Sequence, residues 1–112
     1  MTIKYIFARL NKKNSNNVKD DTALFFITLS SNNLDEDIKK LEDYSDCYHK
    51  LMDGLVCFVE RHSTGSLSAI DIREEVLKIL GDDVFAFVVR CDKYNAAWYM
   101  AEDSCKWLKE HA

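Results

Sequence analysis

The dipeptide Asp53-Gly54, placed between two apolar segments, restricts the fold more than any other feature of this chain. The flanking segments, Tyr48–Met52 and Leu55–Arg61, are rich in aromatic and aliphatic residues typical of strands. Asp-Gly suits a type I′ turn, in which both central residues take positive φ. Because a two-residue connection joins only antiparallel neighbours, the sequence predicts a β-hairpin over residues 48–61.

Two more apolar segments predict strands on either side of this hairpin. Thr22–Ser30 is a continuous apolar run centred on Leu24-Phe25-Phe26-Ile27, and Val84–Cys91 begins with a second such run, Val84–Val89. Uninterrupted runs of this length are typical of strands that are buried on both faces or central in a sheet. Near the N-terminus, Ile3–Leu10 mixes β-branched and aromatic residues with charges, as an edge strand would.

Two amphipathic helices are predicted between these strands. Asn33 can cap the first helix with Glu36 as the capping-box partner, and Ser68 with Asp71 can cap the second, which ends at Gly81. The apolar residues recur at helical spacing. Those of the first helix are Leu34, Ile38, Leu41 and Tyr44, and those of the second are Ala69, Ile72, Val76, Ile79 and Leu80.

From residue 22 onward, the predicted order is strand, helix, strand, hairpin, strand, helix, strand. Since both crossovers should be right-handed, both helices fall on one face of a four-stranded antiparallel sheet. This is the ferredoxin-like split β-α-β arrangement of the α+β class. We expect one domain over residues 1–112: an N-terminal strand and polar Asn-rich loop (1–21), then the core and a C-terminal extension (22–112) with a short helix from about Tyr99 to Glu110.

The two helices leave the opposite face of the sheet without a cover. Leu55–Val59 and Val84–Val89 are apolar on both sides, so that face needs one, and a second protomer is the simplest candidate. Both tryptophans lie in the last fifteen residues, in a region suited to an interface. We therefore expect a homodimer. Its predicted interface residues are Phe85, Phe87, Val89, Tyr94, Trp98 and Trp107.

The charge distribution argues against a dedicated binder of double-stranded nucleic acid. The net charge is −4, but residues 1–19 carry +5 with no acid, which leaves −9 on the rest of the chain. A sequence pI of about 5.3 does not fit the basic face that such binders use. The weak candidates for contact with phosphate are Lys4, Arg9, Lys12 and Lys13, and a solvated basic hairpin is the favoured interpretation.

No motif predicts a catalytic, metal or cofactor site. Cys47, Cys57, Cys91 and Cys105 are widely spaced, without the paired ligands that zinc needs, so we expect reduced thiols in a cytoplasmic protein. Neighbouring acids such as Asp82-Asp83 fall where caps and turns favour them. Phosphate-binding loops and nucleophile elbows are absent from the sequence, and no apolar run approaches the ~18 residues of a membrane span.

Four motifs succeed one another over the second half of the chain. An aromatic strand leads through Asp53-Gly54 into an apolar strand, and Ser68-Ala69-Ile70-Asp71-Ile72-Arg73 opens a helix. Asp82-Asp83 precedes an aliphatic strand, and Ala96-Ala97-Trp98 is followed by Lys106-Trp107-Leu108-Lys109. In this succession the segment from Tyr48 to His111 resembles the Cas2-like and SinR-like small ferredoxin-fold proteins, and the unit Thr22–Tyr44 resembles them loosely.

The resemblance implies a specific site, from which this chain departs. Nuclease members of that family hold a divalent metal with an aspartate at the end of the first core strand of each protomer. The corresponding stretch here, Phe26–Asn33, contains no acid. We therefore expect a non-enzymatic dimeric interaction or regulatory protein that acts through protein partners, with its acidic surface suited to a basic one. The alternative is a small Cas2-like ribonuclease or nucleic-acid-binding protein; as an enzyme it would be a metal-dependent nuclease.

Overall fold

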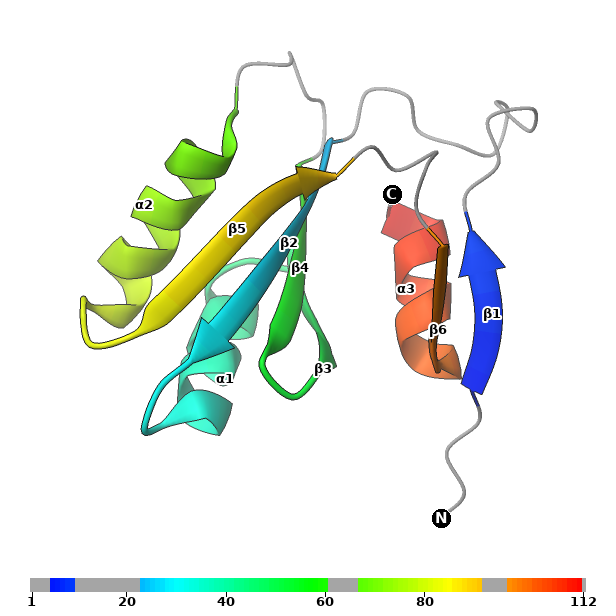
Figure 1. Ribbon diagram of the computed structural model, residues 1–112, viewed down its shortest axis with the longest axis horizontal. Helices are drawn as coiled ribbons and strands as arrows, with labels where there is room; N and C mark the ends of the chain where they lie inside the picture. The colour runs from blue at the N-terminus through cyan, green and yellow to red at the C-terminus, as the bar shows by residue number, and fades with distance from the viewer. Residues whose placement is uncertain (1–4, 10–22, 61–66, 92–96, 112) are drawn as a thin grey trace.

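The computed structural model describes residues 5–9, 23–60, 67–91 and 97–111, which form two sheets and three helices (Figure 1). The strands are β1 (Tyr5–Arg9), β2 (Ala23–Ser30), β3 (Tyr48–Met52), β4 (Leu55–Glu60), β5 (Phe85–Cys91) and β6 (Ala97–Ala101). The helices are α1 (Leu34–Tyr44), α2 (Ala69–Leu80) and α3 (Glu102–His111).

The larger sheet has the ferredoxin-like topology that the sequence predicts. Its strand order is β3-β4-β2-β5, and each neighbouring pair is antiparallel. The strands that are first and third in this unit, β2 and β4, occupy the centre, which requires the two crossovers through α1 and α2. The predicted α+β class, the four-stranded antiparallel sheet, the additional N-terminal strand and the C-terminal helix are all confirmed.

The predicted hairpin forms at Asp53-Gly54, and Gly54 takes a φ of 79°. The turn also lies close to β2, because the Gly54 carbonyl accepts a 2.8 Å hydrogen bond from the Leu29 N–H. A Cβ at Gly54 would approach the Leu29 carbonyl oxygen to 3.2 Å. Both the positive φ and this close approach require glycine here.

The two predicted helix caps have different outcomes. The capping box of α2 is confirmed, since the Ser68 hydroxyl accepts from the Asp71 N–H while the Asp71 carboxylate accepts from the Ser68 N–H. At α1 the prediction is wrong, because the Asn33 side chain makes no capping hydrogen bond. The structure instead places the Ser31 hydroxyl 2.6 Å from Asp37, to which it donates, so a residue outside the helix binds a first-turn carboxylate.

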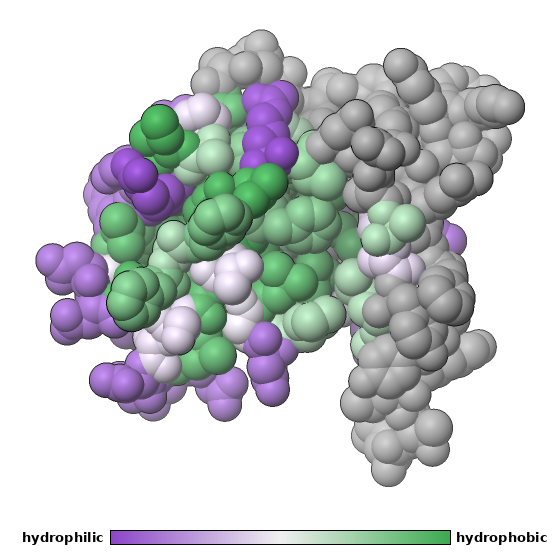
Figure 2. All heavy atoms as spheres, viewed as in Figure 1, coloured by the Kyte–Doolittle hydropathy of each residue, from purple (hydrophilic) through white to green (hydrophobic). Residues whose placement is uncertain are grey.

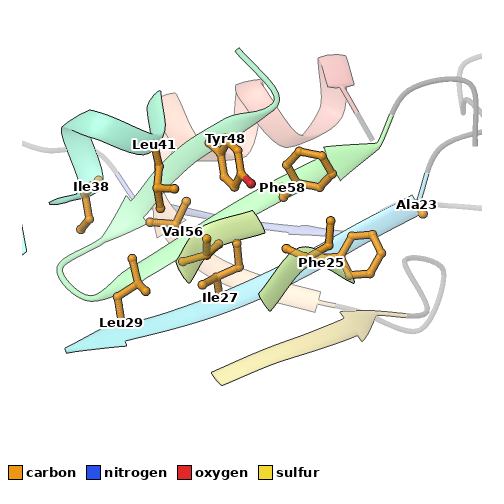
Figure 3. Close-up of a cluster of buried hydrophobic side chains, with 11 residues drawn as sticks. Ala23, Phe25, Ile27, Leu29, Ile38, Leu41, Tyr48, Val56 and Phe58 are labelled. Atoms are coloured by element: carbon orange, nitrogen blue, oxygen red, sulfur yellow. The ribbon is translucent and has the colours of Figure 1, made fainter. Parts of the chain in front are cut away.

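The first core lies between α1, α2 and one face of the sheet (Figure 3). Phe25 and Ile27 of the central strand β2 are fully buried there, against Leu41 of α1 and Val76 of α2. The Tyr48 hydroxyl donates a hydrogen bond to Glu75 of α2, which ties the edge strand β3 to the helix layer. Both helices cover the same face, as the right-handed crossovers require.

A second core occupies part of the opposite face. It joins Leu24, Leu51, Cys57 and Val59 of the sheet to Trp98 and Met100 of β6 and to Cys105 and Leu108 of α3. The predicted helix from Tyr99 is wrong at its start, because residues 97–101 form a strand paired with β1. Trp98 and Met100 are both buried, and burial at a spacing of two residues is the period of a strand.

Candidate interaction surface

The strand β5 lies at the edge of the larger sheet and carries an uncovered row of apolar side chains. Phe85, Phe87 and Val89 are 82%, 68% and 43% exposed, while the alternate residues Ala86 and Val88 pack against the first core. We call Phe85, Phe87 and Val89 the apolar stripe. Figure 2 shows hydrophobic residues gathered over β5 and the adjoining part of the sheet. A row this exposed on an edge strand is unusual unless another chain covers it.

The second core explains why the stripe is exposed while the rest of that face is not. The β1–β6 pair and α3 lie together on the side of β3, away from β5 (Figure 1). On β2, Phe26 lies opposite Val89 and is still partly buried against the second core. Thr28 and Ser30, which lie opposite Phe87 and Phe85, are exposed. The chain therefore covers one half of this face and leaves the β5 half open.

The outer edge of β5 also presents main-chain hydrogen-bonding groups. In β2, the Leu29 N–H points toward the hairpin that leads into β4, where it donates to Gly54. Because N–H and C=O groups of successive residues point to opposite edges of a strand, the even-numbered residues of β2 bond to β5. Their partners include Phe85, Phe87 and Val89, so the main-chain groups of Ala86, Val88 and Arg90 point outward.

A groove runs along this edge, between β5 and α2. Its volume is about 220 Å³, and its lining residues are Ala69, Ile70, Arg73, Ala86, Phe87 and Val88. Ile70 is 61% exposed, on the side of α2 that turns away from the first core. Ile70 is not among the residues predicted from the sequence, although its place outside the predicted apolar face of the second helix is a signal that could have identified it. We refer to this feature as the edge groove.

Two of the predicted interface residues lie inside the chain. Trp98 is 8% exposed in the second core, with its indole N–H buried and without a hydrogen-bond partner. Trp107 is half-buried and stacks between His49 and His111, at ring-centroid distances of 4.7 and 4.3 Å. Tyr94 lies outside the described residues. Of the predicted set, the structure thus brings together Phe85, Phe87 and Val89 as an exposed group.

The basic N-terminal candidates are largely outside the described part of the chain. This applies to Lys4, Lys12 and Lys13. Arg9 ends β1, where it pairs with Ala97 of β6, and only its main chain is described. The possible contact of these residues with nucleic acid stays a prediction.

A polar cavity of about 510 Å³ lies at the end of β2, where the resemblance implied a metal-binding aspartate. It is lined by Ser31, Asn32, Asn33, Asp37, Lys40, Leu80 and Asp83. Asp37, from α1, is buried and accepts a hydrogen bond from Ser31. Asp83, from the loop before β5, lines the same cavity, so two carboxylates lie at this strand end. The sequence pattern explains these acids as residues favoured at caps and turns, and it does not show that Asp37 and Asp83 meet at one strand end. Within the described residues, no three His, Cys, Asp or Glu side chains group to hold a metal ion.

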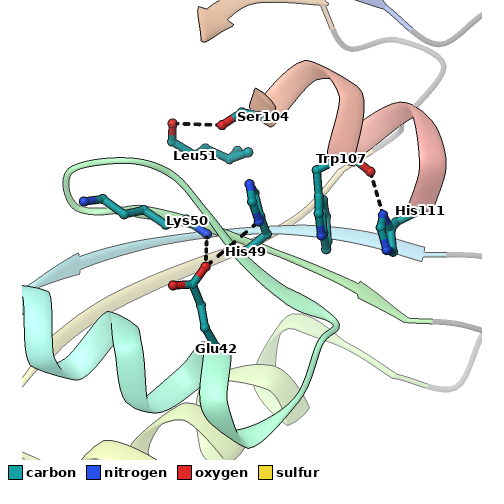
Figure 4. A network of polar contacts seen from close by, with 7 residues as sticks. All are labelled: Glu42, His49, Lys50, Leu51, Ser104, Trp107 and His111. Atoms are coloured by element: carbon teal, nitrogen blue, oxygen red, sulfur yellow. Dashed lines mark hydrogen bonds and ion pairs between the residues drawn. The ribbon is translucent and has the colours of Figure 1, made fainter. Parts of the chain in front are cut away.

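The side chains around Trp107 form the contact between α3 and β3 (Figure 4). Glu42 accepts a 3.2 Å hydrogen bond from the Lys50 N–H, and its carboxylate lies 3.9 Å from His49 Nδ1. Burial lowers the pKa of His49, an effect that Glu42 opposes and His111 reinforces. His111 donates from Nδ1 to the Trp107 carbonyl at 2.8 Å. This arrangement holds a helix in place and has no nucleophile at its centre.

The four cysteines are reduced thiols. Burial raises the pKa of Cys57 far above its ordinary value, which keeps that thiol protonated and unreactive. Cys105 is fully buried in the second core. These two thiols act as small apolar side chains in the packing.

Comparison of the chain with models of protein families, with curated proteins and with solved structures finds no significant match. None of the helices in the described ranges is long and apolar enough to cross a membrane.

Proposed function

We propose that this protein is a non-enzymatic, dimeric interaction or regulatory protein that acts by binding protein partners. The observation that supports this proposal is the apolar stripe on β5, which stays exposed although the same chain builds two cores around it. Burying one such phenylalanine stabilises a complex by about 1.5–3 kcal/mol, so covering the stripe favours the binding of a partner. The surplus of acids outside the N-terminal segment suits a basic partner.

The proposal is tested by measuring association with and without the stripe. In sedimentation and light scattering over a range of concentrations, the wild-type chain of 13.0 kDa should form a dimer. Phe87→Ser should raise the dissociation constant about 30-fold or more, since the central side chain of an interface commonly contributes 2 kcal/mol. Tyr44→Ser is the matched control, because Tyr44 is 61% exposed on α1 and is not part of the stripe. A wild-type monomer at every concentration would contradict the proposed dimer.

A Cas2-like nuclease or nucleic-acid-binding protein is the second candidate. The polar cavity at the end of β2 favours it, because Asp37 and Asp83 offer oxygen ligands of the kind that Mg²⁺ prefers. Lys40 lines the same cavity, and a cation there competes with a metal for these carboxylates. Metal-dependent cleavage of RNA or DNA that Asp37→Asn abolishes would favour this candidate over an interaction protein.

A further inference from the structure

We propose that the dimer forms through the edge of β5, which pairs antiparallel with β5 of a second copy about a two-fold axis at Phe87. The two four-stranded sheets then become one continuous sheet. This inference rests on the proposed function and specifies which contact joins the two copies. It differs from the stacking of one sheet face on another, which the exposed stripe alone would also permit.

The distribution of exposed apolar side chains favours an added strand over a stacked sheet. Among the described residues, six large hydrophobic side chains are exposed. Four of them lie on β5 or beside it: Phe85, Phe87 and Val89 on β5, and Ile70 on α2. The stripe lies on the open face of the sheet, whereas Ile70 lies on α2, across the edge groove from Phe87. A sheet stacked on the open face would leave Ile70 exposed. A strand added to the edge lies beside both Ile70 and Phe87.

The main chain of β5 supplies the hydrogen bonds for such a strand. The N–H and C=O groups of Ala86, Val88 and Arg90 point away from β2. They recur at every second residue, which is the spacing of the hydrogen bonds between two antiparallel strands. Edge strands that native proteins protect are short, charged or interrupted by proline. β5 runs for seven residues, Phe85–Cys91, and has no charged side chain before Arg90.

The stripe determines the register. Antiparallel pairing about Phe87 places Phe87 opposite its own counterpart and Phe85 opposite Val89 of the second copy. In this two-fold register alone, every stripe residue of one copy lies opposite a stripe residue of the second copy. It also sets Ala86 opposite Val88 of the second copy, so outward-pointing main-chain groups meet outward-pointing groups, as hydrogen bonding requires. Directly opposite aromatic and β-branched side chains stabilise an antiparallel pair.

The charges at the two ends of β5 select the antiparallel direction. Asp82 and Asp83 precede the strand and are exposed, and Arg90 is exposed near its end. In the proposed register, the acidic end of one strand lies beside Arg90 of the other copy. A parallel arrangement would place the aspartates of both copies side by side, and like charges at an interface disfavour that orientation. A two-fold antiparallel contact is also self-complementary, which closes the assembly at two copies.

Disulfide formation through a single new cysteine tests the register. In the background Cys47→Ser/Cys91→Ser, the remaining native thiols, Cys57 and Cys105, are buried. Phe87→Cys should then form a covalent dimer under mild oxidation, because Cα atoms directly opposite in a non-hydrogen-bonded pair lie about 4.5 Å apart, within reach of a disulfide. Thr28→Cys, on β2 opposite Phe87, is the control and should stay reduced, since three strand spacings of about 4.8 Å would separate the two copies.

Removal of one outward N–H tests the edge by a second route. Val88→Pro deletes a main-chain donor that points away from β2, a position where sheets tolerate proline. Val88→Thr keeps the N–H and the shape of the side chain and serves as the control. We expect Val88→Pro to weaken the dimer at least tenfold in sedimentation, and Val88→Thr to leave it close to wild type. Circular dichroism of each variant verifies that the monomer is folded.

The outcomes separate this inference from the proposed function. Crosslinking of Phe87→Cys together with loss of the dimer in Val88→Pro would support edge pairing. A wild-type dimer in which Phe87→Cys does not crosslink and Val88→Pro binds normally would overturn edge pairing and leave the interaction function standing; stacked sheets, about 10 Å apart, would give this result. A protein that is monomeric throughout would overturn both.

Discussion

At the scale of single residues, the conformation of two glycines is important for the stability of the fold. Among the described residues, two glycines have positive φ: Gly54, at 79°, lies in the hairpin turn, and Gly81, at 86°, caps the C-terminal end of α2. They differ in their surroundings: a Cβ at Gly54 would meet the Leu29 carbonyl oxygen at 3.2 Å, and a Cβ at Gly81 would meet nothing within 4 Å. Gly54 therefore combines a positive φ with a close approach, whereas Gly81 has a positive φ alone.

We expect Gly54→Ala to lower the free energy of unfolding more than Gly81→Ala. A sparsely populated positive-φ conformation costs an L-residue about 1–3 kcal/mol, which applies to both variants. At Gly54 the hairpin must also move away from β2, so the loss should be larger than at Gly81. Chemical denaturation of the two variants and the wild type measures the difference. Equal losses would show that the turn moves freely relative to Leu29.

His49 is the residue whose titration should influence stability. Burial lowers the pKa of its imidazole, so the folded state binds the proton less well than the unfolded state. Stability is then complete above the unfolded pKa of about 6.5, and it is lost as the pH falls from there toward the lower folded pKa. We expect the free energy of unfolding to fall between pH 7.5 and pH 5, with a smaller fall in His49→Gln. An identical pH dependence in the two proteins would contradict this assignment.

At the scale of elements, the C-terminal unit determines which surface remains free. Strand β6 pairs with β1, and α3 packs its buried residues Cys105 and Leu108 on the sheet. The stacking of Trp107 between His49 and His111 and the 3.3 Å hydrogen bond from the Ser104 hydroxyl to the Leu51 carbonyl fasten α3 to β3 (Figure 4). These contacts are made at the β3 side, so β5 at the other edge touches the second core through Cys91 at its end, and the apolar stripe stays exposed.

At the scale of the whole molecule, folding and association should be coupled. The apolar stripe is exposed in the monomer, and a second copy that binds it stabilises the folded state by mass action. The melting temperature of the wild type should therefore rise with protein concentration, while that of Phe87→Ser should not. Differential scanning calorimetry at several concentrations measures both. A melting temperature independent of concentration in the wild type would argue against a dimer at those concentrations.

The sequence by itself determined the four strands of the main sheet, the two helices that cover it and the topology of that sheet. Local signals were sufficient for this: the Asp53-Gly54 turn, the Ser68 and Asp71 capping box, and the periods of the apolar residues. The right-handed crossover rule then left one arrangement of the four strands. The sequence also predicts Phe85, Phe87 and Val89 as interface residues; the structure finds them exposed on one face of β5, and their part in an interface stays a prediction.

Only the tertiary structure decided how the open face of the sheet is divided. The sequence predicts that this face needs a cover and favours a second copy for it, whereas the structure covers part of the face with β6 and α3 of the same chain. The pairing of β1 with β6 joins segments about ninety residues apart in the sequence, and no local signal specifies such a contact. This pairing and the placement of α3 bury Trp98 within the chain, and they leave the stripe, the outward main-chain groups and Ile70 together along one free edge.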